Sequence, residues 1–229
     1  MVRKVQVYAD GADLAEIKRL GNAVCGYTTN PSLLKSAGVV DYQAFAKTAL
    51  QYAAPAPVSF EVLSDELDEM ERQARIIASW GDRAVVKIPI VNSRGESTVE
   101  VIRRLSEDRI WLNVTAVMTG ADVCRAVAAL RNSGHIISIF AGRIADTGRD
   151  PEMTVRDAAM IAHPSGQKIL WASVREVFNW VQAERSGADI ITMTPAMIEK
   201  MLAFEGKNLD HYTRETVQQF AKDAEGLEL

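Results

Sequence analysis

The sequence has few cysteines, no long apolar run and no excess of basic residues. Its two cysteines, Cys25 and Cys124, are too few for the disulfide framework of a small secreted protein, and we expect both to be packing residues. No apolar run approaches the roughly 20 residues needed to cross a bilayer. The net charge is -4 and the charges are interspersed, so binding to nucleic acid or to a membrane surface is not expected. The first residues lack the apolar core of a signal peptide, which favours a cytoplasmic protein.

Short apolar segments alternate with amphipathic or capped segments along the 229 residues. The apolar segments are 5–9, 23–27, 57–62, 84–90, 110–115, 135–140, 168–172 and 188–192. Strands that alternate with helices predict a parallel sheet, and eight repeats of this length predict an α/β fold, a single-domain (β/α)₈ TIM barrel. No Gly-rich dinucleotide motif follows the first segment, and no linker separates a second domain. We expect residues 1–205 to form the barrel and residues 206–229 to form an extension with a polar helix at 210–224.

Lys87 interrupts the otherwise apolar segment 84–90. The segment reads as a strand that is buried on both faces, because its other residues include Ala84, Val85, Val86, Ile88 and Ile90. Such a strand has no obvious room for an ammonium. Desolvation favours the neutral amine, and a neutral amine in a pocket can form a Schiff base with a carbonyl substrate. The alternative is a lysine that reaches solvent or pairs with a carboxylate.

Polar residues accompany every predicted strand except the last, near the carboxyl ends where the active site of such a barrel lies. They are Asp10, Asn30, Glu61, Lys87, Asn113, Thr115, Ser138, Arg143, Ser173 and Arg175. An amine, two carboxylates and two arginines at one rim suit a class I aldol reaction on a sugar phosphate. The amine would form an iminium, a carboxylate would take the proton of a substrate hydroxyl, and the arginines would bind the phosphate. No cofactor is expected, and the three histidines lie too far apart for a metal site.

Seven short motifs, spread in order over most of the chain, carry a resemblance to a known family. They are YAD at 8–10, TTNPSL at 28–33, VSFEV at 58–62, VVKIP at 85–89, LNVT at 112–115, ISIFAGRI at 137–144 and ASVR at 172–175. Through these motifs the chain resembles the transaldolases, in particular the short forms grouped with the fructose 6-phosphate aldolases.

The resemblance implies a role for each candidate residue. Lys87 would form the Schiff base, and Asp10 would handle the proton of the substrate's C4 hydroxyl. A water that relays protons would be held by Glu61 and Thr115. The dihydroxyacetone hydroxyls would be bound by Asn30, Asn113 and Ser138. The phosphate would be bound by Arg143, Ser173 and Arg175.

Two positions bear on the outcome of the reaction. The aldolase branch of this family tends to have Gln where this chain has Glu61, and Tyr where it has Phe140. Both differences favour a transaldolase, which moves a dihydroxyacetone unit from a ketose phosphate of the fructose 6-phosphate or sedoheptulose 7-phosphate type to an aldose phosphate. The alternatives are an aldolase that releases free dihydroxyacetone, a non-catalytic phosphosugar-binding barrel, or a transaldolase that acts on a sulfosugar or another unusual sugar.

The natural substrate and the assembly stay open at this point. The chain departs from the family pattern at Gly11, at Ile139 and over residues 116–119, and the pentose phosphate pathway is one of several possible settings. Short forms of the family are often ring-shaped homo-oligomers, pentamers or decamers, in which a C-terminal helix reaches a neighbour. The predicted helix at 210–224 is the candidate, and the alternative is a helix packed on its own barrel.

Overall fold

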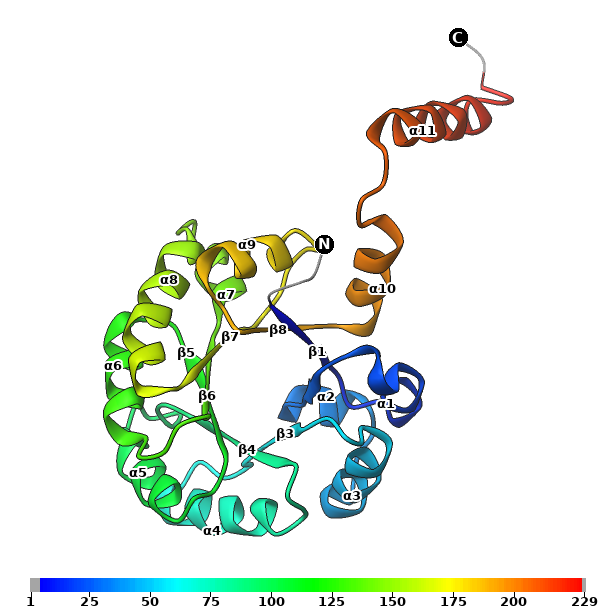
Figure 1. The fold of residues 1–229 in the computed structure, drawn as a ribbon. Coiled ribbons are helices and arrows are strands. Elements are labelled where there is room, and N and C mark those ends of the chain that lie inside the picture. Colours follow the sequence, from blue (N-terminus) through cyan, green and yellow to red (C-terminus); the bar gives the residue numbers. More distant parts are fainter. Residues whose placement is uncertain (1–4, 228–229) are drawn as a thin grey trace.

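The computed structural model describes residues 5–227, and eight parallel strands form a closed barrel within them. Each strand pairs with the next along the chain, and the last strand pairs with the first. The strands are β1 (Gln6–Asp10), β2 (Gly26–Thr28), β3 (Val58–Glu61), β4 (Ala84–Pro89), β5 (Leu112–Val117), β6 (Ile136–Ile139), β7 (Lys168–Trp171) and β8 (Ile190–Met193). Helices surround this barrel (Figure 1). The predicted (β/α)₈ TIM barrel is therefore confirmed.

The helices lie in the connections between strands and after β8. They are α1 (Leu14–Leu20), α2 (Pro31–Ser36), α3 (Tyr42–Tyr52), α4 (Leu67–Ala78), α5 (Val99–Glu107), α6 (Gly120–Ala129), α7 (Ala141–Asp146), α8 (Pro151–Ala162), α9 (Asn179–Ser186), α10 (Pro195–Phe204) and α11 (Leu209–Asp223). The sequence did not predict α2 and α7, because six residues are too few to display a helical apolar period.

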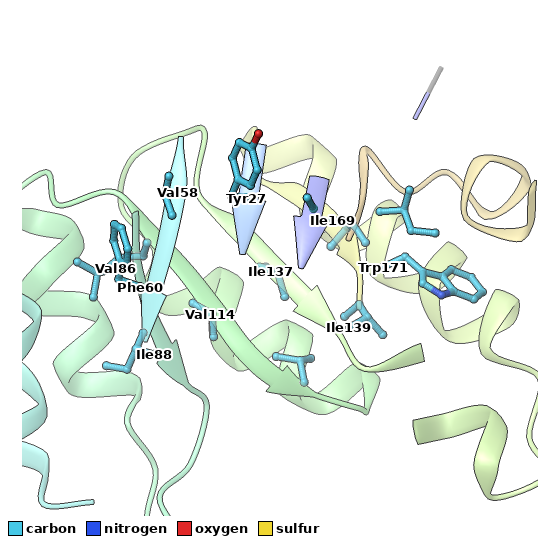
Figure 2. Packing of buried hydrophobic residues seen from close by; sticks show 14 of the residues in the cluster. Tyr27, Val58, Phe60, Val86, Ile88, Val114, Ile137, Ile139, Ile169 and Trp171 are labelled. Atoms are coloured by element: carbon cyan, nitrogen blue, oxygen red, sulfur yellow. The ribbon is translucent and has the colours of Figure 1, made fainter. Parts of the chain in front are cut away.

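The two faces of each strand carry different side chains. Val86 and Ile88 belong to the hydrophobic layer between strands and helices, together with Phe60 and Ile137 (Figure 2). Successive side chains of a strand point to opposite faces, so Lys87, between Val86 and Ile88, points into the barrel.

A second, smaller apolar cluster fills the barrel interior below the site. Its buried members are Tyr8, Ile136, Leu170, Ala172 and Ile190. Gly26, opposite Tyr8 in the β1–β2 register, makes room for this packing, because a Cβ there would lie 2.4 Å from the tyrosine ring.

Two expectations about local structure were wrong. The fifth strand begins and ends two residues later than predicted, and its register with β6 shifts between Val114 and Val117, where Ala116 adopts a φ of 59°. Cys25 precedes β2 and is exposed, and Cys124 is exposed on α6, so neither is a buried packing residue. Cys25 was expected to be buried because its neighbours in the sequence are apolar, but β2 begins one residue after it.

The last helix lies apart from the barrel (Figure 1). None of the residues in α11 is buried. Its start is tied to the end of α10, where Lys207 lies 4.9 Å from the centre of the Phe204 ring and 4.3 Å from that of Tyr212. Within residues 5–227, no helix has the length and apolar character needed to span a membrane.

Candidate active site

A cavity of about 260 Å³ opens at the carboxyl ends of the strands. The candidate residues that line it are Asp10, Asn30, Lys87, Ser138, Phe140, Arg143, Ser173 and Arg175. A larger cavity of about 670 Å³ also touches Asp10, but it lies against α1, α2 and α3 and is mostly apolar. The smaller cavity holds the amine and the arginines, so we place the chemistry there.

Lys87 is buried beside a carboxylate. Its side chain is 8% exposed, and its Nζ lies 2.9 Å from Glu61 Oε2. Nζ also donates a hydrogen bond of 3.0 Å to the carbonyl oxygen of Thr29. Glu61 and Lys87 meet because they are directly opposite in the β3–β4 register. The carboxylate is the nearest acceptor for the proton that the amine must lose before it attacks a carbonyl.

Asp10 lies at the end of β1, opposite Thr28 on β2. The Thr28 hydroxyl donates a hydrogen bond of 2.6 Å to Asp10 Oδ1. Burial raises the pKa of Asp10, and this hydrogen bond and the charge of Lys87 offset only part of the rise. A carboxylate with a raised pKa is a better proton acceptor at neutral pH than an ordinary aspartate, which suits a general base.

Neutral hydrogen-bonding groups lie on the side of the site formed by β5 and β6, where Ser138 lines the cavity and Asn113 is buried behind it. Ser138 donates a hydrogen bond of 2.6 Å to Asn113 Oδ1, and Asn113 Nδ2 donates one of 3.2 Å to Ser59 Oγ. These contacts fix the orientation of the buried Asn113 amide. On the opposite side, Asn30 caps α2 by accepting a hydrogen bond from Leu33 N, which leaves its amide nitrogen to donate.

The Thr115 hydroxyl is fully buried and has no hydrogen-bond partner among the described residues. It does not line the cavity itself, but Thr115 is opposite Pro89, two residues beyond Lys87 on β4. A buried hydroxyl without a partner is a position at which an ordered water or a polar ligand atom gains a hydrogen bond.

Two guanidinium groups lie at the other side of the cavity. The Arg143 guanidinium lies 5.2 Å from the centre of the Phe140 ring. Arg175 is engaged with Asp146 on α7 through Nε, at 3.0 Å, and Nη2, at 2.5 Å. The hydrogen bond from Arg175 holds the pKa of Asp146 below its usual range. This geometry presents Arg175 in a fixed orientation beside Ser173, whose φ of 63° is unusual for a residue other than glycine.

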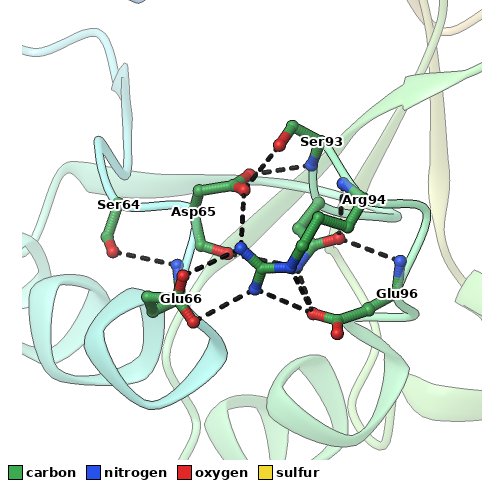
Figure 3. A network of polar contacts seen from close by, with 7 residues as sticks. Ser64, Asp65, Glu66, Ser93, Arg94 and Glu96 are labelled. Carbon is green, nitrogen blue, oxygen red and sulfur yellow. Dashed lines mark hydrogen bonds and ion pairs between the residues drawn. The ribbon is translucent and has the colours of Figure 1, made fainter.

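A polar network joins the two loops that follow β3 and β4 (Figure 3). Arg94 binds both carboxylate oxygens of Glu66, at 2.8 and 3.0 Å, and lies 2.9 Å from Glu96. Asp65 accepts hydrogen bonds of 2.7 and 2.6 Å from the backbone and hydroxyl of Ser93. These loops continue directly from the strands that carry Glu61 and Lys87, so the network restrains the rim beside the ion pair.

Comparison with known proteins decides the family. The model of a family described as transaldolase/fructose-6-phosphate aldolase matches residues 7–229. The chain belongs to the transaldolase/fructose-6-phosphate aldolase family. Two relatives, each named "Probable transaldolase", come from Dehalococcoides mccartyi (31% identical, covering 86% of this chain and 90% of the relative) and Thermoplasma volcanium (34% identical, covering 92% and 93%).

Solved structures with little sequence similarity share the barrel. A putative dihydrodipicolinate synthase family protein from Coccidioides immitis matches with a TM-score of 0.57 at 10% identity, over 83% of this chain and 67% of that one. An N-acetylneuraminate lyase from Mycoplasma synoviae matches with a TM-score of 0.55 at 9% identity, over 97% and 82%. At these identities the likeness supports the fold alone. Membership of the transaldolase/fructose-6-phosphate aldolase family supports a transaldolase-type enzyme.

The sequence did not predict four polar residues of this site. Thr28, Thr192 and Thr194 line the cavity, and Asp146 pairs with Arg175. Threonine is common in strands, so Thr28 and Thr192 gave no signal of their own, although each follows the inward-facing period of its strand. Thr192 also shows that the last strand does contribute a polar group to the rim. In residues 5–227, no group of three or more His, Cys, Asp or Glu side chains is arranged to hold a metal ion.

Proposed function

We propose that the protein is a transaldolase that transfers a dihydroxyacetone unit from a ketose phosphate to an aldose phosphate through a Schiff base on Lys87. The observation that carries the proposal is the placement of Lys87. Its amine is buried between Glu61 and the carbonyl of Thr29, and it faces a cavity that also contains Asp10. A buried amine with an adjacent proton acceptor and a second carboxylate is the arrangement that iminium chemistry needs.

We assign residues to the steps of this reaction as follows. The Lys87 amine attacks the ketone carbonyl of the donor after passing a proton to Glu61, and loss of water gives the iminium. Asp10 takes the proton of the C4 hydroxyl, the bond between C3 and C4 breaks, and its electrons move into the iminium to give an enamine. The aldehyde product leaves. The enamine then attacks the acceptor aldehyde, and hydrolysis of the new iminium frees Lys87. A water bound to Glu61 and Thr115 is proposed to relay the protons of the carbinolamine steps.

Substrate positioning follows from the polar groups around the cavity. Asn30 and Asn113 are proposed to bind the hydroxyls of the dihydroxyacetone unit, with Ser138 holding the Asn113 amide in place. Arg143, Arg175 and the Ser173 hydroxyl are proposed to bind the phosphate, because guanidinium groups match the geometry of a dianion.

Phe140 and Glu61 favour transfer over release of free dihydroxyacetone. Transfer requires that the enamine waits for an acceptor, so hydrolysis of the bound three-carbon unit must be slow. Phe140 lines the cavity with an apolar ring in contact with Arg143, and a tyrosine there would add a hydroxyl able to orient water. If hydrolysis of the bound unit were fast, the same mechanism would release free dihydroxyacetone. An aldolase of this kind is the second candidate function.

The assay that tests the proposal follows fructose 6-phosphate and erythrose 4-phosphate by nuclear magnetic resonance. We expect sedoheptulose 7-phosphate and glyceraldehyde 3-phosphate in equal amounts, with little free dihydroxyacetone. Free dihydroxyacetone as the main product would favour the aldolase. If only a sulfonated ketose is turned over, the Schiff-base mechanism stands and the natural donor is a sulfosugar rather than a ketose phosphate. No turnover with any ketose would contradict an enzymatic role and favour a phosphosugar-binding barrel. The double variant Glu61→Gln/Phe140→Tyr should increase the share of free dihydroxyacetone.

We also propose that residues 206–229 form an extension that packs on a neighbouring copy in a ring-shaped homo-oligomer. The outer limits of this extension and of the 1–205 barrel lie beyond the described residues. An isolated helix of 15 residues is marginal in water, and α11 exposes Leu209, Val217 and Phe220. Light scattering of Phe220→Glu beside the unaltered protein tests this. A smaller assembly is expected, and an unchanged mass would contradict it.

A further inference from the structure

A chain of two hydroxyls leads from β8 to Asp10. The Thr192 Oγ1 and Thr28 Oγ1 atoms lie 2.6 Å apart, and Thr28 Oγ1 lies 2.6 Å from Asp10 Oδ1. Both threonines are buried, with 5% and 2% exposure. The barrel register explains the contact. β1 lies between β8 and β2, Thr192 is opposite Tyr8, and Thr28 is opposite Asp10, two residues farther along the same face of β1.

The direction of this chain follows from the number of protons. A threonine hydroxyl has one proton to donate. The carboxylate of Asp10 accepts only, so Thr28 donates its proton to Oδ1. The short contact between the hydroxyls must then be a hydrogen bond that Thr192 donates to Thr28. A hydroxyl that receives a hydrogen bond becomes a stronger donor, because the bonds in a chain polarise one another.

We propose that Thr192 is a positioning residue that acts through Thr28 to keep the Asp10 carboxylate ionised and oriented. This inference rests on the proposed function for the role of Asp10 in the reaction. With Oδ1 held by Thr28, Oδ2 is the oxygen left to take the proton of the substrate hydroxyl, and among the described residues no group donates a hydrogen bond to Oδ2. Thr192 touches neither the amine nor the carboxylate directly, so its effect passes through one hydroxyl.

The charged groups inside the cavity favour the ionised form of Asp10 to different extents. Lys87 is the cation whose charge acts on Asp10, and it is itself paired with Glu61 on β3. Arg143 on α7 and Arg175 beyond β7 line the same cavity. The hydroxyl chain is a contact to Asp10 that is independent of these charged groups.

The two strands beside β1 add no competing charge to the hydroxyl chain. β2 and β8 contain no acidic or basic side chain. Burial raises the pKa of Tyr8 to about 12, so this phenol is neutral. On the neighbouring helices, Arg19 of α1 pairs with Glu199 of α10 at 2.7 Å, and Asp13 caps α1. From the β2 and β8 side of the barrel, Asp10 therefore receives a hydrogen bond from a neutral hydroxyl and no charge from the two strands.

The test compares Thr192→Val, which removes the hydroxyl, with Thr192→Ser, which keeps it. The full-length protein is labelled with ¹³C at aspartate carboxyl carbons, and the Asp10 resonance is assigned with Asp10→Asn and titrated without substrate. Thr192→Val should raise the pKa of Asp10 by about 0.5 to 1 unit, and Thr192→Ser should stay close to the unaltered protein. The acidic limb of the kcat/KM–pH profile, which reports the free enzyme, should move by the same amount.

A double variant separates action through Thr28 from a general packing effect. In the background of Thr28→Val, the change Thr192→Val should give no further shift of the Asp10 titration. A shift of equal size in that background, an equal shift in Thr192→Ser, or no shift in Thr192→Val would each overturn the inference. Because the titration needs no substrate, its outcome is separate from that of the proposed function, which fails if no ketose is turned over.

Discussion

The change Gly142→Ala tests the geometry of the arginine side of the cavity. Gly142 is the second residue of α7, and its amide lies 3.4 Å from the carbonyl oxygen of Ala172. A Cβ added to Gly142 would lie 1.6 Å from the carbonyl oxygen of Ser173 and 3.2 Å from Arg175 Cγ. The methyl group therefore meets the backbone of the segment that carries two of the proposed phosphate ligands.

The size of the effect follows from this overlap. Contacts of a Cβ below 3.0 Å essentially never occur, so the two segments must separate by at least about 1.4 Å. A displacement of about 1 Å at a binding group can cost about 100-fold in rate. We expect Gly142→Ala to lower kcat/KM for fructose 6-phosphate about 100-fold, mainly through KM, because phosphate binding assists ground state and transition state alike.

The assay measures kcat/KM with fructose 6-phosphate and with fructose, both with erythrose 4-phosphate as acceptor. The loss should be large for the phosphorylated donor and small for fructose. Gly120→Ala is the matched control, because a Cβ at Gly120, at the start of α6, meets nothing within 4 Å. An equal loss with both donors, or no loss with either, would refute the placement of the phosphate beside Ser173.

Three further predictions concern the amine, acid stability and the rim. Lys87→Met should abolish turnover and leave the fold intact by circular dichroism; full activity would contradict the Schiff base. Burial lowers the pKa of His135 from 6.5 to about 4, so only the unfolded chain is protonated between these values; the unfolding free energy should fall by up to about 3 kcal/mol as pH drops through this window. Urea unfolding should show that the unfolding free energy of His135→Asn no longer falls with pH in this window. A variant at the exposed His163 should keep the pH dependence of the unaltered protein. Arg94→Gln should speed amide hydrogen exchange in residues 62–66 and 91–97, and unchanged exchange would mean that its ion pairs do not order the loops.

The sequence was sufficient for the barrel because eight short apolar segments alternate with helical segments along the chain. Val86 and Ile88 must face the helices in a (β/α)₈ barrel, which leaves Lys87 facing inward. Once the inward face is known, residues near the ends of other strands share the same rim. That is why Asp10, Lys87 and Arg143 line one cavity although up to 133 positions separate them.

Side-chain contacts between different elements could not be predicted from the sequence. The pairing of Arg175 with Asp146 depends on how α7 lies against the loop after β7. The Thr28–Thr192 contact depends on barrel closure, which brings the second and last strands to either side of β1. The exposure of Cys25 depends on where a three-residue strand begins, and apolar composition does not define such a boundary.

The proposed reaction depends on an iminium between Lys87 and a ketose phosphate. Borohydride reduction in the presence of fructose 6-phosphate, followed by intact mass and peptide mapping, detects this intermediate. We expect a stable three-carbon adduct on the peptide that contains Lys87, and depletion of that adduct when erythrose 4-phosphate is added before the reductant. An adduct on another lysine, or no adduct with any ketose donor, would contradict it.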